Sequence, residues 1–207
     1  MKHYLKKNII TGVITFLLIA GGCGAVEPEK RDYPLALAWD YEDGNYSVVY
    51  GMANLQEVTE QDKGNQDTDL SLKVQGQNLE EIRANYARSQ QYYLDLGHVK
   101  AIIFSERLLN QPEAYQNLMK DMQKSTEIGK NAYVFMTNSM EDVMKTGAQK
   151  EDGLGQYLTG IYDNHEGARQ KGVTLEDIYY DWNNEERITR LPQLKVEEGK
   201  VILCENL

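Results

Sequence analysis

The sequence has little cysteine, proline and histidine. Its 207 residues include two cysteines, four prolines and three histidines. This length excludes a disulfide-stapled miniprotein, and neither cysteine belongs to a Cys-x-x-Cys redox or zinc motif. Hydrophobic residues make up 41% of the chain and charged residues 26%, which is ordinary for a globular domain and too apolar for a disordered one. We therefore expect a packed core in one or two domains.

Basic residues are also scarce. The 22 Lys and Arg against 32 Asp and Glu give a formal charge of -10, and three of the lysines lie in the first seven residues. Without residues 1–22 the balance is 19 against 32, which leaves -13. Such a body offers no basic footprint for phosphates, so we expect no nucleic-acid partner. It would also be repelled by anionic lipid, so membrane attachment would need a covalent group.

The first 23 residues have the pattern of a secretory leader. A basic start precedes an apolar run at residues 9–20, which is shorter than the roughly 20 residues that a membrane-spanning helix needs. The residues Ala20-Gly21-Gly22-Cys23 that follow resemble a bacterial lipobox. We expect residues 1–22 to be a lipoprotein signal peptide, Cys23 to carry the lipid, and residues 23–34 to form a tether. The alternative is an ordinary leader cut elsewhere, and either cleavage exports the protein.

Hydrophobic periodicity in the rest of the chain predicts a single mixed α/β domain over residues 35–207. Strands are expected at 35–39, 46–53, 70–74, 99–104, 132–136, 191–196 and 201–204. Helices are expected from 79 to about 94–97, from 112 through 122, and at 140–145, 154–162 and 175–182. Residues 56–69 are polar and predict an exposed loop. The turns Asp43-Gly44 and Glu198-Gly199 predict a hairpin at each end of a central mixed sheet.

Candidate catalytic residues are few. Asp95, His98 and Ser105 flank a predicted strand, but Ser105 lacks the glycines of a nucleophile elbow. His165 lies beside Glu166 without a second histidine at metal-ligand spacing, and a helix cap is the simpler interpretation. Gly153-Leu154-Gly155 does not have the spacing of a nucleotide-binding loop and is better explained as the flexible start of a helix. We therefore expect no catalytic, cofactor-binding or metal-binding residue.

Two further groups of residues are open to more than one interpretation. The polar residues around the first turn could attract calcium, namely Asp40, Glu42, Asp43 and Asn45. They miss the EF-hand register, however, and acidic hairpin tips are usually solvated. Of the fourteen tyrosines, four fall on apolar helix faces as predicted core residues, namely Tyr86, Tyr93, Tyr157 and Tyr179. Others could serve a protein or ligand interface, such as Tyr92, Tyr162 and Tyr180. Cys204 is predicted to be a small apolar residue in the last strand.

Several short motifs resemble those of the Ger(x)C spore germination lipoproteins, the C subunits of nutrient germinant receptors. After the lipobox cysteine the chain has Lys30-Arg31-Asp32 before the first strand, and later Asn78-Leu79-Glu80-Glu81-Ile82 at a helix start. The most similar segment runs from Leu96-Gly97-His98-Val99-Lys100 through the next strand to Ser105-Glu106-Arg107-Leu108, and Thr174 to Ile178 and Leu191-Pro192 follow. The resemblance extends over residues 30–207 and corresponds to the family's N-terminal domain.

The resemblance implies a non-catalytic accessory subunit that needs no cofactor. It would be held by lipid, such as palmitate, on the outer face of the spore inner membrane, beside integral membrane receptor subunits. His98 would order the loop before its strand, and Lys100 would lie at an edge or on the surface. Two alternatives remain: an envelope lipoprotein that presents a binding module to a ligand or partner, and an exported hydrolase whose Ser105, His98 and Asp95 would have to converge.

Overall fold

The structure is a computed structural model that describes residues 26–52, 71–150, 152–164, 172–185 and 190–204. The predicted leader, Cys23, the loop at 56–69 and His165 lie outside the described residues. The chain divides into two units between Lys30 and Arg31. The described part of the first unit contains a short 3-10 turn, η1 (Pro28–Lys30), in which Lys30 Nζ lies 2.7 Å from a carboxylate oxygen of Glu27.

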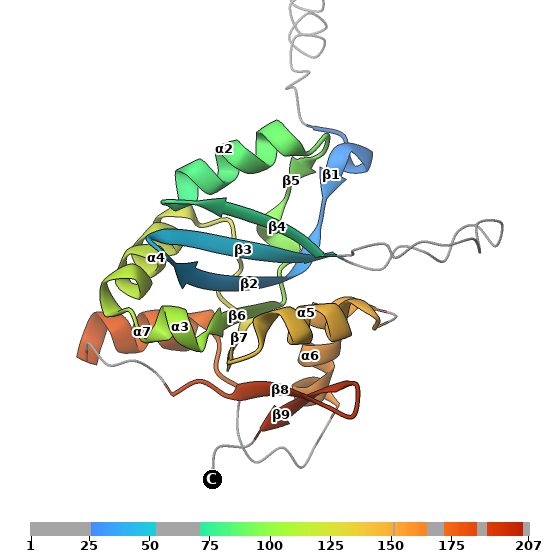
Figure 1. The fold of residues 1–207 in the computed structure, drawn as a ribbon, viewed down its shortest axis with the longest axis vertical. Helices are drawn as coiled ribbons and strands as arrows, with labels where there is room; N and C mark the ends of the chain where they lie inside the picture. The colour runs from blue at the N-terminus through green and yellow to red at the C-terminus, as the bar shows by residue number, and fades with distance from the viewer. Residues whose placement is uncertain (1–25, 53–70, 151, 165–171, 186–189, 205–207) are drawn as a thin grey trace, which may run out of the picture. The chain divides into compact units, whose positions relative to one another are not determined.

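Seven strands form one mixed sheet in the described part of the second unit (Figure 1). Their order across the sheet is β4-β3-β2-β6-β7-β8-β9. Parallel pairs join β2 to β6, β6 to β7 and β7 to β8, whereas β3 and β9 run antiparallel to their neighbours. The strands are β2 (Pro34–Glu42), β3 (Asn45–Met52), β4 (Ser71–Gly76), β6 (Ala101–Ser105), β7 (Tyr133–Thr137), β8 (Gln193–Glu197) and β9 (Lys200–Cys204).

Both predicted hairpins are confirmed. The two residues of each turn have positive φ, with Asp43 at 52° and Gly44 at 82°, and Glu198 at 50° and Gly199 at 71°. Two successive positive φ values are the requirement of the tight turns that match the twist of a hairpin, and glycine adopts them without steric cost. The chain therefore reverses after β2 and after β8, as the Asp-Gly and Glu-Gly pairs predict.

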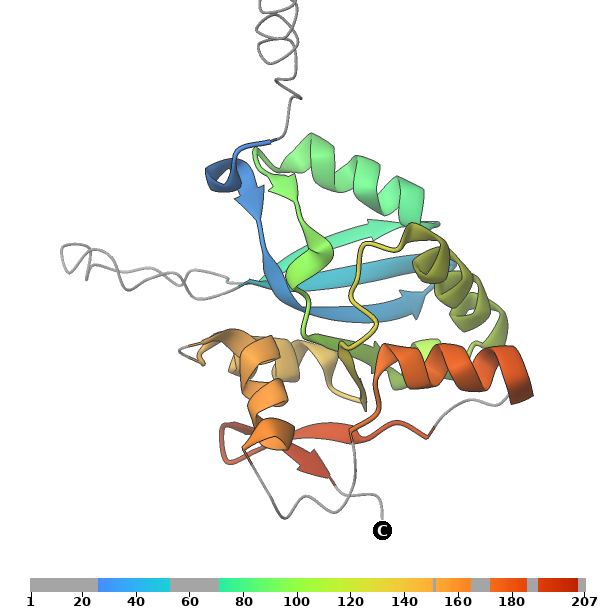
Figure 2. The same ribbon diagram turned by 180° about the vertical axis from the view of Figure 1, so that it is seen from behind.

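Helices cover both faces of the sheet (Figure 2), which confirms the mixed α/β class. One core contains buried side chains of α2 (Leu79–Ser89), α3 (Glu106–Leu109), α4 (Pro112–Ser125) and α7 (Leu175–Glu185). The other contains those of α5 (Met140–Ala148) and α6 (Gly153–Asp163). Alternate residues of β2, β3, β6 and β7 serve the two cores, so that Leu37 and Trp39 of β2 lie in the first and Ala36 and Ala38 in the second.

The helix predicted to reach residues 94–97 ends at Ser89, which corrects that boundary. No apolar residue follows Tyr86 at helical spacing before the chain turns extended at Gln90, so nothing would hold a longer helix to the core. Tyr93 lies instead in a two-stranded parallel sheet, where β5 (Tyr93–Leu94) pairs with β1 (Arg31–Asp32). Its side chain is exposed, so its assignment to the core was wrong.

Candidate functional site

A row of buried polar side chains crosses the sheet at one end. Asp40 pairs in register with Ser47 on β3, and Ser105 pairs with Thr137 on β7. Ser105 Oγ joins the two halves by donating a hydrogen bond to Asp40 Oδ1 at 2.5 Å. These four are the buried polar or charged side chains among the described residues. Because buried polar groups are costly unless they are hydrogen-bonded, their concentration in one row marks this end of the sheet as a built feature.

Asp40 is the centre of this row. Besides Ser105, its carboxylate accepts hydrogen bonds from the Tyr41 backbone N–H at 2.9 Å and from the guanidinium of Arg107. Arg107 bonds both carboxylate oxygens, through Nε at 3.2 Å to Oδ1 and through Nη2 to Oδ2. Burial alone would raise the pKa of Asp40, but the hydrogen bonds from Arg107, Ser105 and Tyr41 outweigh it and hold the pKa below its ordinary value. Asp40 is therefore a buried anion at neutral pH.

The local structure explains why Ser105 and Arg107 meet Asp40. Ser105 ends β6 and caps α3, because its Oγ accepts a hydrogen bond from the Leu108 backbone N–H at 3.0 Å. The helix therefore begins directly at the end of the strand. Arg107, two residues on, then lies over the neighbouring end of β2, where its Nη1 also contacts Glu42 at 2.6 Å. One cap thus positions the hydroxyl and the guanidinium for the same carboxylate.

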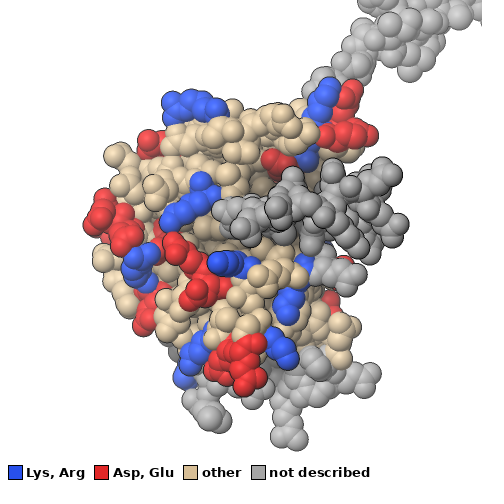
Figure 3. Space-filling view, turned by 45° about the vertical axis from the view of Figure 1, so that its right-hand side comes forward, with Lys and Arg blue, Asp and Glu red and all other residues tan. Residues whose placement is uncertain are grey.

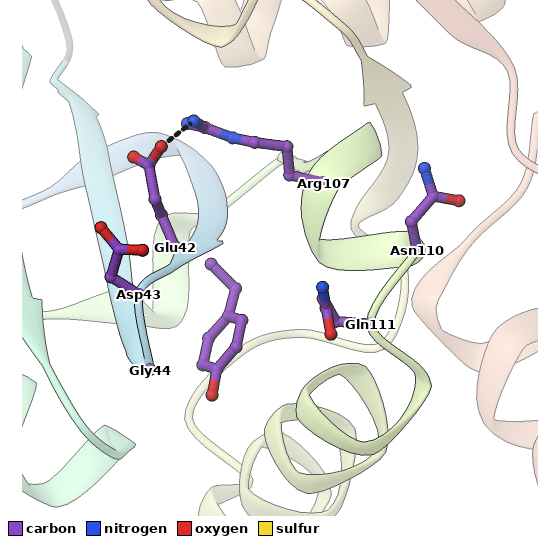
Figure 4. Close-up of a pocket in the computed structure, with 7 residues that line it drawn as sticks. Glu42, Asp43, Gly44, Arg107, Asn110 and Gln111 are labelled. Carbon is purple, nitrogen blue, oxygen red and sulfur yellow. Dashed lines mark hydrogen bonds and ion pairs between the residues drawn. The ribbon is translucent and has the colours of Figure 1, made fainter.

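Two clefts open beside this cluster at the carboxyl ends of β2 and β6. Figure 4 shows the smaller cleft, of about 480 Å³, between the Asp43-Gly44 turn, the Glu42–Arg107 pair and the Asn110-Gln111 connection. The larger cleft, of about 710 Å³, extends from Asp40 and Arg107 to the start of α5. The direction in which successive strands are added to the sheet changes at β2, because β3 and β4 lie on one side of it and β6 lies on the other. Ligand sites in α/β sheets commonly lie at such reversals.

Acidic side chains outnumber basic ones in the larger cleft. Its basic groups are Lys73 and Arg107, and Lys73 Nζ lies 3.8 Å from a carboxylate oxygen of Glu141. Its acidic groups are Asp40, Glu42, Glu106, Glu141 and Asp142. A cleft of this composition suits a polar or cationic group better than an anion, because its guanidinium is already paired with Asp40 and Glu42.

The three residues of the hydrolase hypothesis do not converge. His98 belongs to η2 (Leu96–His98), before β6, whereas Ser105 lies at the other end of that strand. His98 Nδ1 is 4.0 Å from Asp95, and its ring meets Tyr33 edge-to-face at 4.9 Å. Asp95 forms an ion pair with Arg31 instead, with Nη1 and Oδ2 at 2.7 Å. Ser105, His98 and Asp95 therefore do not form a catalytic triad in this chain.

The acidic residues around the first turn also differ from the sequence interpretation. Asp40 was grouped with the solvated hairpin tip, but it is buried in the row described above, and Glu42 is paired with Arg107. No group of three His, Cys, Asp or Glu side chains able to hold a metal occurs among the described residues. The Asp40–Arg107 pair was not predicted from the sequence. Its signal was a carboxylate at the end of an otherwise apolar strand, which requires a partner from elsewhere in the chain.

The remaining candidates take structural places. Gly155 lies against β2 so closely that an added Cβ would be 2.0 Å from the Leu35 carbonyl oxygen, and Gly153 opens α6 with φ at 77°. This agrees with the prediction that these glycines start a helix. Tyr86 and Tyr179 are buried as predicted, while Tyr157 is half-buried and donates to the Val201 carbonyl at 2.9 Å. Cys204 is half-buried in the last strand.

Contacts fasten the start of the second unit at the opposite end of β2. Tyr86 donates a hydrogen bond to Asp32, and the Asp95 backbone N–H donates to the Asp32 carbonyl at 2.9 Å. The Arg31 hydrogen bond to Asp95 lowers the pKa of this carboxyl. Lys100 is exposed beside this end, and its backbone N–H donates to the Leu35 carbonyl at 2.8 Å. We name this end of β2 the tether end and the Asp40 end the cleft end.

Comparison with known proteins identifies the family. A family model described as the spore germination protein N-terminal domain matches residues 24–196, most of the chain. Neither the comparison with curated proteins nor that with solved structures returned a match. No helix in the described ranges is long and apolar enough to cross a membrane. The match agrees with the motifs around His98, Ser105 and Thr174, and it shows that the chain belongs to the Ger(x)C spore germination protein family, through its N-terminal domain, with a role in spore germination.

Proposed function

We propose that the protein is a non-catalytic, lipid-anchored accessory component of a nutrient germinant receptor in the spore membrane. The observation that carries this proposal is the family match over residues 24–196. That segment begins one residue after Cys23, and Cys23 is the residue at which the lipobox-like sequence predicts that the mature chain starts. The proposed place is the outer face of the spore inner membrane, next to integral membrane subunits of the receptor.

The geometry of the cleft end supports an accessory role over a hydrolytic one. Ser105 Oγ donates to Asp40 and accepts from the Leu108 backbone, and His98, the base of the hydrolase hypothesis, lies at the other end of β6. Arg107 holds the Asp40 carboxylate in its charged form. These contacts order the ends of two strands, which is a structural task.

A lipid on Cys23 would hold such a body at the membrane without help from charge. Each buried methylene contributes about 0.8 kcal/mol, so two or three acyl chains anchor stably. The charge of -13 that remains after residue 22 would oppose attachment to anionic lipid by any other route. The anchor therefore has to be covalent in this proposal.

The test is germination of spores that carry Cys23→Ala, compared with wild type and with a deletion. Loss of refractility is scored with a panel of nutrients, and membrane fractions are probed for the protein. Cys204→Ala is the matched control, because it removes the other cysteine from a described strand. We expect Cys23→Ala to release the protein from the membrane and to slow nutrient-triggered germination as the deletion does, with Cys204→Ala behaving as wild type.

One observation favours the second candidate, an envelope lipoprotein that binds a ligand or partner. This is the larger cleft at the carboxyl ends of β2, β6 and β7, where ligands bind in many α/β proteins. Normal germination of the deletion strain with every nutrient would contradict the receptor role and favour this candidate.

A further inference from the structure

Two tyrosines that are consecutive in sequence are exposed at the tether end, and we call them the aromatic patch. Tyr92 is 41% exposed and Tyr93 is 56% exposed. The other exposed large hydrophobic side chains among the described residues are Val26, which precedes the second unit in sequence, and Tyr180 on α7. Single exposed aromatics are ordinary on protein surfaces, but a neighbouring pair is a candidate interaction surface.

The patch is fixed to the point where the chain enters the folded unit. Tyr93 pairs in register with Arg31 in the β1–β5 sheet, and the Arg31 guanidinium lies 5.9 Å from the centre of the Tyr93 ring. The hydrogen bond from the Asp95 backbone to Asp32 continues this pairing. The patch therefore lies beside the residue at which the second unit begins.

The length of chain between Cys23 and Arg31 restricts how this unit can meet a membrane. Eight residue steps span at most about 29 Å when fully extended. The 3-10 turn at Pro28–Lys30 shortens this reach, since it rises only about 2 Å per residue. A folded unit of this size is about 40 Å across. A lipid on Cys23 would thus keep the tether end near the bilayer. The side of the unit farthest from Arg31 could not touch the bilayer, because the reach is shorter than the width of the unit.

The charges at this end offer only weak attraction to anionic lipid. Arg31 is paired with Asp95, and Lys100 is exposed beside this pair. Figure 3 shows Lys and Arg side chains interspersed with Asp and Glu on the face that it presents, without a large basic patch. Contact with a membrane would have to come from the aromatic rings. Tyrosine suits this place, because its ring is apolar and its hydroxyl remains hydrated at the level of the lipid headgroups.

We propose that Tyr92 and Tyr93 contact the lipid headgroup region and orient the protein on the membrane, with the cleft end directed away from it. This inference rests on the lipid anchor of the proposed function. It goes further by naming a surface, its lipid partner and the orientation that follows. The contact depends on the aromatic rings, so it requires neither anionic lipid nor low salt.

The three exposed tyrosines allow a test within one molecule. The full chain is produced in a bacterial host that exports lipoproteins, and intact membranes are iodinated with lactoperoxidase, an enzyme that does not enter the bilayer. Mass spectrometry then gives the iodination of Tyr92, Tyr93 and Tyr180, with released Cys23→Ala protein as the unanchored reference. We expect Tyr92 and Tyr93 to react several-fold less on the membrane than in the reference, and Tyr180 to react equally in both.

A second arm supplies the anchor chemically, so that the patch is tested even if Cys23 carries no natural lipid. In a Cys204→Ser background, the Cys23 thiol is coupled to a maleimide-bearing lipid in phosphatidylcholine vesicles. If the wild-type chain produced in the host is absent from the membrane fraction, the natural anchor is refuted and the patch is not. Equal reactivity of all three tyrosines on coupled vesicles would refute the patch alone.

The composition of the vesicles distinguishes an aromatic contact with lipid from electrostatic attraction and from contact with a protein. Protection of Tyr92 and Tyr93 on phosphatidylcholine at high salt supports the aromatic contact. Protection that needs phosphatidylglycerol and disappears in salt would overturn it, because the attraction would then be electrostatic. Protection seen in native membranes and absent from pure lipid vesicles would also overturn it and assign the patch to a protein partner.

Discussion

The two ends of β2 are held by the same kind of contact in different surroundings. At each end an arginine pairs with a carboxylate more than sixty residues away in sequence, Arg31 with Asp95 and Arg107 with Asp40. Asp95 and Arg31 are both partly exposed, whereas the Asp40 side chain is 4% exposed. Water screens the first pair and is excluded from one member of the second. The cleft end is therefore expected to depend on its ion pair far more than the tether end does.

The comparison also separates two tasks. The cleft end joins a buried serine and a buried aspartate to an exposed arginine, and these side chains form a polar floor for the clefts. The tether end joins short backbone pairs and partly exposed charges to the aromatic patch. In the proposed orientation the tether end faces lipid, and the cleft end faces receptor subunits or solvent.

The largest expected effect is at the cleft end. Arg107→Met leaves the buried Asp40 carboxylate without its charged partner. The loss of unfolding free energy should be smaller than the roughly 3 to 5 kcal/mol of a fully buried pair, because the Arg107 side chain is 57% exposed, and larger than that of an exposed pair. The matched control is Arg83→Met, because Arg83 pairs with Glu127 at 2.8 Å where both side chains are well exposed. Exposed pairs contribute about 0 to 1 kcal/mol. Urea denaturation measures both variants, and equal losses would contradict the importance of burial.

A double variant checks that the unpaired carboxylate causes this loss. Adding Asp40→Asn to Arg107→Met removes the buried charge and keeps a side chain of nearly the same volume. We expect the double variant to recover part of the stability that Arg107→Met loses. If the two substitutions simply add, the coupling between the residues is absent and the cleft-end interpretation is wrong.

The next effect tests packing at the tether end. Gly155→Ala would place a Cβ 2.0 Å from the Leu35 backbone oxygen, so α6 or β2 has to move, at a cost of about 1 to 3 kcal/mol. Gly160→Ala, one turn further along α6, meets only the flexible Asn164 side chain at 3.3 Å. This control should be neutral or stabilising, since alanine favours helices by about 1 kcal/mol over glycine. Thermal unfolding of the pair measures the difference.

The sequence could predict much of this fold, because the elements depend on local patterns. Apolar runs gave the strands, and helical spacing gave α4 and α7 with boundaries close to those observed. The cleft end depends on distant residues instead. Asp40 and Arg107 meet only because β2 and β6 pair in parallel with Trp39 beside Phe104, and no local pattern specifies that register. The same limit applies to Tyr93, whose place follows from its pairing with Arg31.

A smaller effect is expected in the pH dependence of stability. The folded-state pKa of Asp40 and of Asp95 lies below the ordinary value of about 3.9. A depressed carboxyl pKa contributes stability that is fully present above the unfolded pKa and is lost as pH falls through the folded one. Wild type should therefore lose stability below about pH 4.

Arg107→Met should weaken the Asp40 contribution. Without the guanidinium, only the hydrogen bonds from Ser105 and the Tyr41 backbone oppose the effect of burial, so the pKa of this carboxyl rises toward its unfolded value. The variant should therefore lose less stability than wild type as the pH falls below about 4. Urea unfolding at a series of pH values between 3 and 7 compares the two proteins, and parallel curves for them would contradict the buried-anion assignment.

The smallest effect is expected from Asp95→Asn at the tether end. The amide keeps an oxygen that can accept the Gly97 backbone hydrogen bond, which is 3.0 Å long in the wild type, and loses the charge and the acceptor oxygen that face Arg31. Tyr86 and the backbone pairing still hold Asp32 in place. The midpoint of thermal unfolding should fall far less than in Arg107→Met, and the difference from wild type should shrink at high salt, because screening weakens exposed pairs. A loss as large as that of Arg107→Met, and insensitive to salt, would show that both ends of β2 depend equally on their ion pairs.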